Sequence, residues 1–337
     1  MSRARACAPY AGIVAFGCLS YLVVMHVNGF YSQILIQVLS WATAAVGVNI
    51  TSGLGGSASL MQGAYYGLGA YASAILLTHG VNFFLTLPLV CLMAAVLALA
   101  VGLLFARTRG QYFAIGTLFL GVVFNVLATN LNSLTGGAIG MSVPAALSAS
   151  QSVTVICAAL TASLALFSWI SRHRLGRRLT SVRDDESLSA HLGVPATQVK
   201  VAGFVLAGVV GAVAGAAYGQ FYGSLAPSSF TYLTGFLMFV AVGVGGPGRL
   251  FGPLLGCALI MGLPPALNIP NGATMLVVGV IFVVITILVP RGLAGILEDL
   301  WRRRPGALRP RYPRERRVTA LAEEVTPEVT ARTEKVT

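Results

Sequence analysis

The sequence predicts an all-α, polytopic integral membrane protein with about ten transmembrane helices, and two observations lead to this prediction. The first is composition: of 337 residues, 56% are apolar and 9% are charged, whereas about 25% of the residues of a soluble domain are charged. The second is the placement of charge, because Asp, Glu, Lys and Arg are absent from residues 6–106, 110–171, 201–248 and 250–290. A helix needs roughly 20 apolar residues to cross the hydrocarbon core. Each uncharged stretch therefore holds two or more helices.

Clusters of Gly, Pro, Asn and Ser divide these stretches into separate helices. The expected spans are residues 9–27, 31–51, 57–78, 84–106, 112–131, 152–170, 200–222, 229–245, 250–267 and 272–290. The eighth and ninth are short for full spans, so we expect them to be tilted, broken or re-entrant, and eight or nine spans is the alternative count. The pairs Gly246-Pro247 and Gly252-Pro253 predict a broken helix in this region.

The basic residues predict the orientation of these helices. Ten crossings place every basic cluster on the side of the N-terminus. The clusters are Arg3 with Arg5, Arg107 with Arg109, residues 172–200, Arg249, and the chain after Arg291. Because loops rich in basic residues stay on the cytoplasmic side of a membrane, we predict that both termini are cytoplasmic.

This orientation divides the chain into a cytoplasmic N-terminus at 1–8, a transmembrane domain at 9–290 with a cytoplasmic loop at 171–200, and a cytoplasmic tail at 291–337. The tail is basic and Pro-rich and then of mixed charge, with little to bury, so we expect it to be disordered. The net charge of +12 comes from Arg residues that flank apolar spans, without a folded basic module. We therefore predict contact with anionic membrane lipids and no nucleic-acid partner.

The loop Gly176–Lys200 holds a large share of the few charges and predicts a short capped helix. Ser181 and Asp184 have the spacing of a capping box, Gly193 fits the position after the helix, and Pro195 prevents continuation. One interpretation is a stabilised surface helix, and the other is a coupling helix that lies in the groove of a cytoplasmic partner. The candidate coupling residues are Arg183, Asp184, Asp185, Glu186, Leu188, His191, Leu192 and Gly193.

Four sequence blocks support the second interpretation. They are "GLGGSASLMQGAYYGLGAYASAIL" from Gly53, "RTRGQYFAIGTLFLGVVFNVLATNLNSLTGG" from Arg107, "GRRLTSVRDDESLSAHLGVPATQVK" from Gly176 and "VGVGGPGRLFGPLLGCALI" from Val242. In this order they resemble the permeases of branched-chain amino acid ABC transporters, of the LivM type, over roughly residues 35–300. Two departures concern the substrate: Gln62 stands where the family commonly has histidine, and Ala138 and Ile139 follow "LTGG", where it has an acidic or polar residue.

The resemblance implies a multi-pass permease of the bacterial cytoplasmic (inner) membrane. Its implied partners are two cytoplasmic ATPase subunits, a second permease and an extracytoplasmic substrate-binding protein. Leucine, isoleucine and valine are the family's default cargo, while related importers for urea, short amides, other amino acids or sugars are the alternative. The motif search agrees with this division, because the chain contains no GxxxxGK[ST] loop, and "GGPGRLFG" from Gly245 lacks the Lys and hydroxyl of such a loop.

We therefore predict a transport protein and not an enzyme, with no catalytic residue, metal or bound cofactor, in which partner subunits use ATP. The rival mechanism is an ion-coupled secondary transporter, which typically places ionisable side chains at membrane depth. No Asp, Glu, Lys or Arg falls inside a predicted span apart from Lys200 at the first residue of the seventh. This pattern argues against ion coupling, although hydroxyls and carbonyls can also bind sodium.

Neutral polar residues within the spans are candidates for lining the pathway. They are Gln62, Tyr65, Tyr66, Asn125, Asn130 and Gln220. Each has an alternative role as an interhelical hydrogen-bonding group or an interfacial anchor. Small residues that let helices approach closely recur at Gly208, Gly211, Gly215 and Gly219, so these four predict a packing face.

Overall fold

The computed structural model of the chain describes residues 3–27, 29–105, 108, 110–267, 271–289 and 292–296. The chain divides into two compact units, residues 1–297 and residues 298–337, and the described residues all belong to the first. From residue 297 onward, the predicted disordered tail lies outside the described residues.

Helices make up almost all of the described chain. They are α1 (Arg3–His26), α2 (Phe30–Val48), the π-helix η1 (Asn49–Leu54), α3 (Gln62–Thr78), α4 (Phe83–Leu104), α5 (Gln111–Asn130), α6 (Asn132–Thr135), the 3-10 helix η2 (Gly137–Ile139), α7 (Ala149–Arg172), α8 (Arg174–Asp184), α9 (Glu186–His191), α10 (Ala196–Tyr222), the 3-10 helix η3 (Pro227–Phe230), α11 (Tyr232–Gly245), α12 (Gly252–Cys257), the π-helix η4 (Ala258–Gly262), α13 (Leu263–Ala266) and α14 (Asn271–Leu288). In the described part of the chain, the only strands are β1 (Met141–Ser142) and β2 (Ser224–Leu225), which pair antiparallel.

The all-α prediction is confirmed, and a helix overlaps each predicted span position. Five helices are long and apolar enough to cross a membrane: Phe30–Leu54, Phe83–Leu104, Gln111–Asn130, Ala149–Arg172 and Ala196–Tyr222. Shorter apolar helices lie at Gly12–His26, Tyr232–Gly245, Gly252–Ala266 and Ala273–Ile285. The chain is therefore built as a multi-pass membrane protein.

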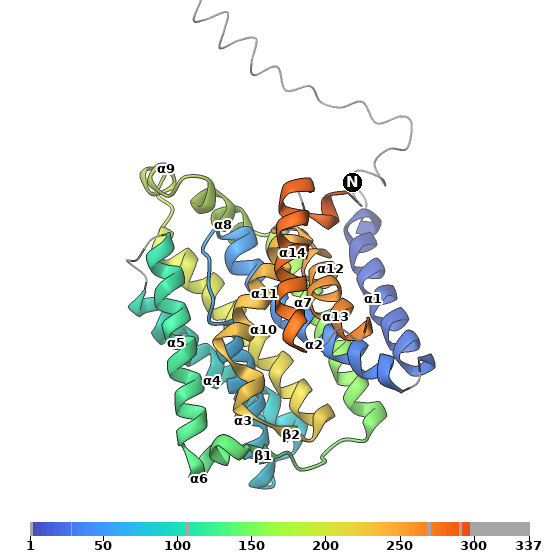
Figure 1. The fold of residues 1–337 in the computed structure, drawn as a ribbon. Helices are drawn as coiled ribbons and strands as arrows, with labels where there is room; N and C mark the ends of the chain where they lie inside the picture. The colour runs from blue at the N-terminus through green and yellow to red at the C-terminus, as the bar shows by residue number, and fades with distance from the viewer. Residues whose placement is uncertain are drawn as a thin grey trace, which may run out of the picture. The chain divides into compact units, whose positions relative to one another are not determined.

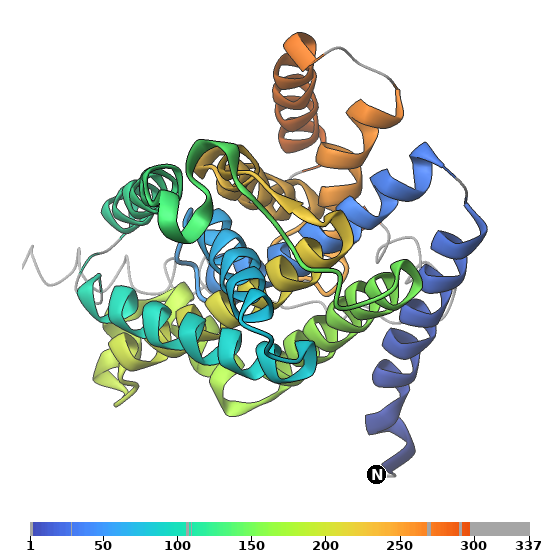
Figure 2. The same cartoon turned by 90° about the horizontal axis from the view of Figure 1, so that it is seen from below.

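The long helices run up and down between two ends of a bundle (Figure 1). The start of α1 lies at the same end as α8 and α9, and α6, β1 and β2 lie at the opposite end. Seen from below in Figure 2, α1 lies at the edge of the bundle, where it packs on α7 and α2.

Helix α10 is the packing centre, and it contacts α2, α3, α4 and α7. A Cβ built at Gly208 would lie 2.8 Å from Cβ of Ala98, and one at Gly211 would lie 2.6 Å from Nε2 of Gln62. At Gly215 the backbone of α3 leaves no space for a side chain, whereas at Gly219 the nearest atom is 3.5 Å away. The glycines of α10 thus allow α3 and α4 to approach its backbone closely.

The predicted break before the ninth span lies at residues 246–251, where the chain turns between α11 and α12. Gly246 has a φ of 111°, a conformation that a residue with a side chain rarely adopts, and Pro253 begins α12. After this turn the helix continues through η4 into α13.

Several boundaries differ from the sequence prediction, among them the start of the first helix, which is Arg3 and not residue 9. The third span begins at Gln62 and not near residue 57, because residues 56–60 run without helical structure. The segment expected to begin the disordered tail contains a helical turn at 293–296, in which Ala294 is buried. Gly292 has a φ of 70° and lies against Gly246, so the chain is anchored to the bundle before residue 297.

Candidate functional site

The charged loop between α7 and α10 folds into two short helices joined at Asp185. The predicted capping box is wrong, because residues up to Asp184 belong to α8 and Ser181 bonds to Arg178 O within that helix. The N-cap of α9 is Asp185, whose extended backbone (φ −156°, ψ 108°) lets its Oδ1 accept a hydrogen bond from Leu188 N at 2.9 Å. The chain therefore makes a corner at this residue.

The end of α9 follows the sequence prediction closely. Gly193 has a φ of 80°, its N–H donates to Ala190 O at 3.0 Å, and the N–H of Val194 donates to Ser189 O at 3.0 Å. These two bonds form a Schellman motif, in which a left-handed residue satisfies the last carbonyls of a helix. The loop is thus capped at both ends of α9, which holds this short helix in a fixed shape.

The outer face of α9 carries large apolar side chains. Leu188 is 58% exposed and Leu192 is 75% exposed, although Ser189 between them is buried. His191 is also exposed, and its Nδ1 lies 2.7 Å from Ser187 O. Two exposed leucines on a rigid, capped helix next to charged residues are typical of a protein-docking surface.

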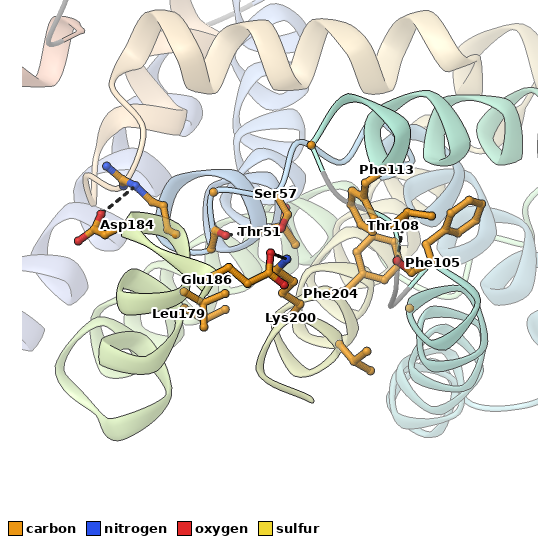
Figure 3. A pocket seen from close by; sticks show the side chains of 18 of the residues that line it. Thr51, Ser57, Phe105, Thr108, Phe113, Leu179, Asp184, Glu186, Lys200 and Phe204 are labelled. Carbon is orange, nitrogen blue, oxygen red and sulfur yellow. Dashed lines mark hydrogen bonds and ion pairs between the residues drawn. The ribbon is translucent and has the colours of Figure 1, made fainter. Parts of the chain in front are cut away.

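An ion pair ties α9 to the first turns of α10. Lys200 Nζ lies 2.8 Å from Glu186 Oε2, and both side chains are largely covered, with exposed fractions of 20% and 26%. The pair lies beside a cavity of about 220 Å³ whose other wall is formed by Phe105, Phe113 and Phe204 (Figure 3). Glu186 is therefore held by a neighbouring helix, whereas Asp184 is 70% exposed and pairs with the adjacent Arg183, whose Nε lies 4.0 Å from its Oδ1.

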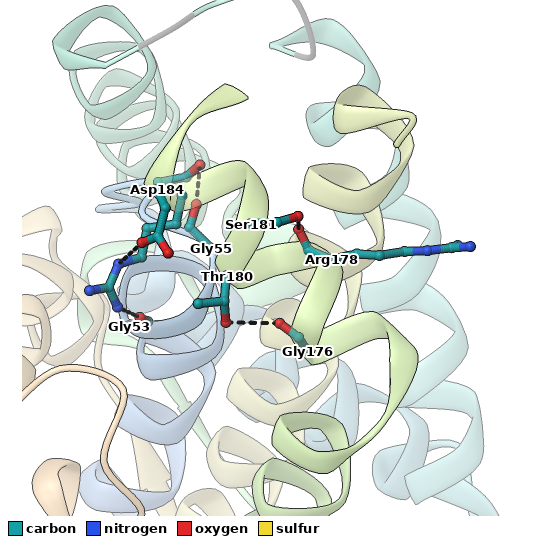
Figure 4. A network of polar contacts seen from close by, with 9 residues as sticks. Gly53, Gly55, Gly176, Arg178, Thr180, Ser181 and Asp184 are labelled. Atoms are coloured by element: carbon teal, nitrogen blue, oxygen red, sulfur yellow. Dashed lines mark hydrogen bonds and ion pairs between the residues drawn. The ribbon is translucent and has the colours of Figure 1, made fainter. Parts of the chain in front are cut away.

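A second contact ties α8 to the glycine-rich segment after α2. Arg183 Nη1 donates to Gly53 O at 2.5 Å (Figure 4). Gly56, with a φ of 65°, lies under the alkyl part of the same side chain, and a Cβ there would be 3.0 Å from Cβ of Arg183. Arg183 was predicted as part of the coupling segment, and in the structure its guanidinium bonds to the end of η1.

The same glycine-rich segment meets the turn between α11 and α12. Asn49 is fully buried, and its Oδ1 accepts a hydrogen bond from Gly248 N at 2.7 Å while its Nδ2 donates to Arg249 O at 2.8 Å. Asn49 was not among the predicted site residues, although a lone amide four positions before "GLGG" in an apolar run was an available signal. The segments GLGGSASL from Gly53 and GVGGPGRL from Gly243, which share the pattern Gly-apolar-Gly-Gly, thus lie in contact.

A comparison with known protein families covers most of the chain. The family described as "Branched-chain amino acid transport system / permease component" matches residues 30–286, from the start of α2 into α14. The chain belongs to this permease family. The matched region includes the two short helices α8 and α9 and the segments that Asn49 joins.

Individual relatives agree with this assignment. The chain is 28% identical over 294 residues to the "High-affinity branched-chain amino acid transport system permease protein LivM" of Escherichia coli (strain K12), covering 78% of this chain and 69% of that protein. It is 25% identical over 283 residues to the LivH permease protein of the same strain, covering 76% and 91%. The solved structure "PsaBC from Streptococcus pneumoniae in complex with Fab" aligns with a TM-score of 0.43 and 16% identity, covering 80% of this chain and 96% of that one, a likeness too distant to carry an argument. This permease is thus a subunit of an ABC importer.

Three of the predicted pathway residues of this permease lie between its own helices. Gln62 is 2% exposed, and its Nε2 donates to Ala44 O at 2.8 Å and to Ala207 O at 3.1 Å. Tyr65 and Tyr66 are completely buried, and the hydroxyl of Tyr66 lies 2.9 Å from Ser40 Oγ. In this conformation these side chains hold α3 to α2 and α10 and do not face an opening.

The other three predicted pathway residues differ from one another. Asn125 Nδ2 donates to Pro227 O at 2.8 Å and so fixes α5 to η3, whereas Asn130 is exposed and bonds within its own helix to Val126 O. Gln220 is 7% exposed, and both its amide atoms are buried without a hydrogen-bond partner among the described residues. Of the six, Asn130 is the one that is exposed.

Proposed function

We propose that this permease imports branched-chain amino acids as one half of a heterodimeric membrane pathway in the bacterial cytoplasmic membrane. The family description and the names of the relatives LivM and LivH support this cargo and a pairing of two different permeases. ATP would be used by two separate cytoplasmic ATPase subunits, and an extracytoplasmic binding protein would deliver the amino acid. A neutral pathway suits a zwitterion, because dipoles can accommodate both of its charges without retaining either.

The proposed topology has ten crossings with both termini in the cytoplasm. It is supported by the alternating direction of the helices and by the gathering of charge at one end, where α8 and α9 lie beside the start of α1 (Figure 1). Arg249 belongs to the same end, since its carbonyl bonds to Asn49 and the adjoining Gly53 bonds to Arg183. The positive-inside rule assigns this end to the cytoplasm.

The observation that carries the proposal of ATPase docking is the exposure of Leu188 and Leu192 on α9. In the proposed topology this helix lies in the cytoplasm, where lipid does not cover apolar side chains. Removing such a surface from water is favourable at about 25 cal/mol per Å². We therefore expect a groove on an ATPase subunit to cover these two leucines. Exposed Asp184 and His191 would lie at the rim of that contact.

The proposal is tested by purifying the tagged permease in mild detergent with its native partners. We expect two ATPase chains and a second permease to be recovered, and leucine uptake by the reconstituted complex to depend on ATP. The double variant Leu188→Asp, Leu192→Asp should lower ATPase recovery at least tenfold while membrane insertion is unchanged. Ile139→Asp is the matched control, since Ile139 is 94% exposed and belongs to the outer loop by this topology.

Other outcomes have distinct meanings. Transport by this chain without ATP would contradict the ABC mechanism and restore the ion-coupled alternative. ATP-dependent uptake of urea or a sugar, but not of leucine, would retain the mechanism and replace the cargo.

A further inference from the structure

Three segments that are distant in sequence meet at one point near the charged end of the bundle. They are the end of η1, the turn between α11 and α12, and the last turn of α8. A Cβ at Gly248 would lie 3.3 Å from Gly53 O and 3.7 Å from Arg183 Nη1, while Arg183 Nη1 itself bonds to Gly53 O. The guanidinium of Arg183 therefore lies over the seam between the two glycine-rich segments.

Asn49 joins these two segments beneath the guanidinium. Its Oδ1 accepts a hydrogen bond from Gly248 N, and its Nδ2 donates one to Arg249 O. The Asn49 residue is fully buried. Gly53 allows this contact, because a Cβ there would lie 3.0 Å from Cα of Gly248. Two hydrogen bonds from one buried side chain to one turn make the seam a rigid joint, since separating the partners would leave the buried amide of Asn49 unsatisfied.

The π-helical form of η1 explains why Gly53 O is available to α8. In an α-helix this carbonyl would accept from Ser57 N, but Ser57 N donates to Thr51 O at 3.0 Å and Gly55 N donates to Ile50 O at 3.2 Å. The wider turns direct the carbonyl of Gly53 to Arg183. π-Helical turns are frequent at functional positions of helices, and this one directly continues α2, one of the long apolar helices.

We propose that Arg183 and Asn49 are positioning residues that transmit the movement of α8 and α9 to the membrane helices. Arg183 holds η1, which continues α2, through its hydrogen bond to Gly53 O. When η1 moves, the hydrogen bonds of Asn49 move the turn between α11 and α12 with it. Pulling on α9 thus moves three helix ends together. This inference rests on the proposed function, because it requires an ATPase that moves α9, and it adds the internal route by which that movement reaches the pathway.

The first test compares two arginines of α8 in the complete, reconstituted transporter. Arg183→Met keeps the alkyl part that lies over Gly56 and removes the guanidinium. Arg178→Met is the control, since Arg178 is exposed on the same helix and points away from the seam (Figure 4). We expect Arg183→Met to retain its ATPase subunits and to hydrolyse ATP within about twofold of wild type, while leucine uptake falls at least tenfold. Arg183→Lys should restore part of the uptake, and Arg178→Met should match wild type.

The ratio of ATP hydrolysed to leucine imported distinguishes two roles of Arg183. It rises if Arg183 transmits movement, and it is unchanged if Arg183 only stabilises the end of η1. If uptake and hydrolysis fall in the same proportion as thermal stability, Arg183 only stabilises the end of η1 and the proposal is wrong. Unchanged uptake in Arg183→Met would overturn it as well. A wild-type complex that shows no ATP-dependent uptake would instead refute the proposed function.

A measurement on the unperturbed joint covers the case in which Arg183→Met does not fold. Spin labels at the exposed residues Thr180 and Pro247 report the distance between α8 and the α11–α12 turn. In the complete wild-type transporter, we expect the same distance distribution with and without bound ATP, because the joint moves as one body. A distance that changes with nucleotide would contradict the proposed joint.

Discussion

Helices α10 and α5 are both long enough to span a membrane and have nearly the same mean hydropathy, 2.0 and 1.9, but they are buried to very different extents. Within the most apolar window of α10, 72% of the residues are buried by the rest of the chain, whereas the figure for α5 is 17%. Hydropathy therefore identifies helices that suit a membrane, and it does not distinguish a helix that other helices surround from one that meets lipid or another subunit.

The side chains that differ between the two helices explain this contrast. α10 carries glycine and alanine where α3 and α4 cross it, so the backbones approach closely and gain dispersion contacts. α5 instead projects bulky residues along one exposed face, among them Tyr112, Phe119 and Val123. In a membrane there is little hydrophobic gain from helix association, so small residues decide which helix becomes central.

The largest expected effect is that of adding one methyl group to each helix. Gly215→Ala places a Cβ onto the backbone of Tyr66, so the helices α10 and α3 must separate. We expect this overpacking to lower the free energy of unfolding by about 1–3 kcal/mol. The matched variant Gly121→Ala on α5 meets no atom closer than 3.9 Å and gains about 1 kcal/mol of helix propensity. Unfolding of the purified permease in mixed SDS micelles measures both, and equal effects would show that α10 is not the packing centre.

A smaller effect is expected from the polar bridge between α3 and its neighbours. Gln62→Leu removes the donors to Ala44 O and Ala207 O, and we expect a loss of about 1 kcal/mol, typical of interhelical hydrogen bonds in membranes. Asn130→Leu is the control, because Asn130 is exposed on α5 and bonds only within its own turn in the described structure. The same SDS unfolding measurement applies.

Leucine uptake by these two variants addresses the alternative role. If Gln62→Leu abolishes uptake while stability is unchanged, Gln62 lines the pathway in another conformation, and the packing interpretation is wrong.

The helical architecture was predictable because it depends on local composition. Charge-free runs located the apolar helices, and Gly246-Pro247 marked the turn before α12. The start of α9 was harder to predict, because Asp184 and Asp185 can both cap a helix. Only the extended backbone of Asp185 decides between them.

The joint around Arg183 could not be predicted from spacing. Asn49 lies about 200 positions before its partners Gly248 and Arg249, and no local period links residues at that separation. The shared Gly-apolar-Gly-Gly pattern was visible, but a pattern does not indicate that two segments touch. Tertiary packing supplied this part of the site.

The smallest effect is expected from the hydroxyls of two adjacent tyrosines on α3, the helix packed against α10. Tyr66→Phe removes the contact with Ser40 Oγ, which itself donates to Ala214 O at 3.4 Å, so three helices lose a shared polar contact. We expect a loss of about 0.6 kcal/mol. Tyr65→Phe should be neutral or slightly stabilising, because its buried hydroxyl has no hydrogen-bond partner among the described residues. Tyr112→Phe on α5 serves as the exposed control. If Tyr65→Phe proved the more harmful of the two buried variants, the hydroxyl of Tyr65 would have a partner in the working transporter, and this part of the interface between α3 and α10 would open during the cycle.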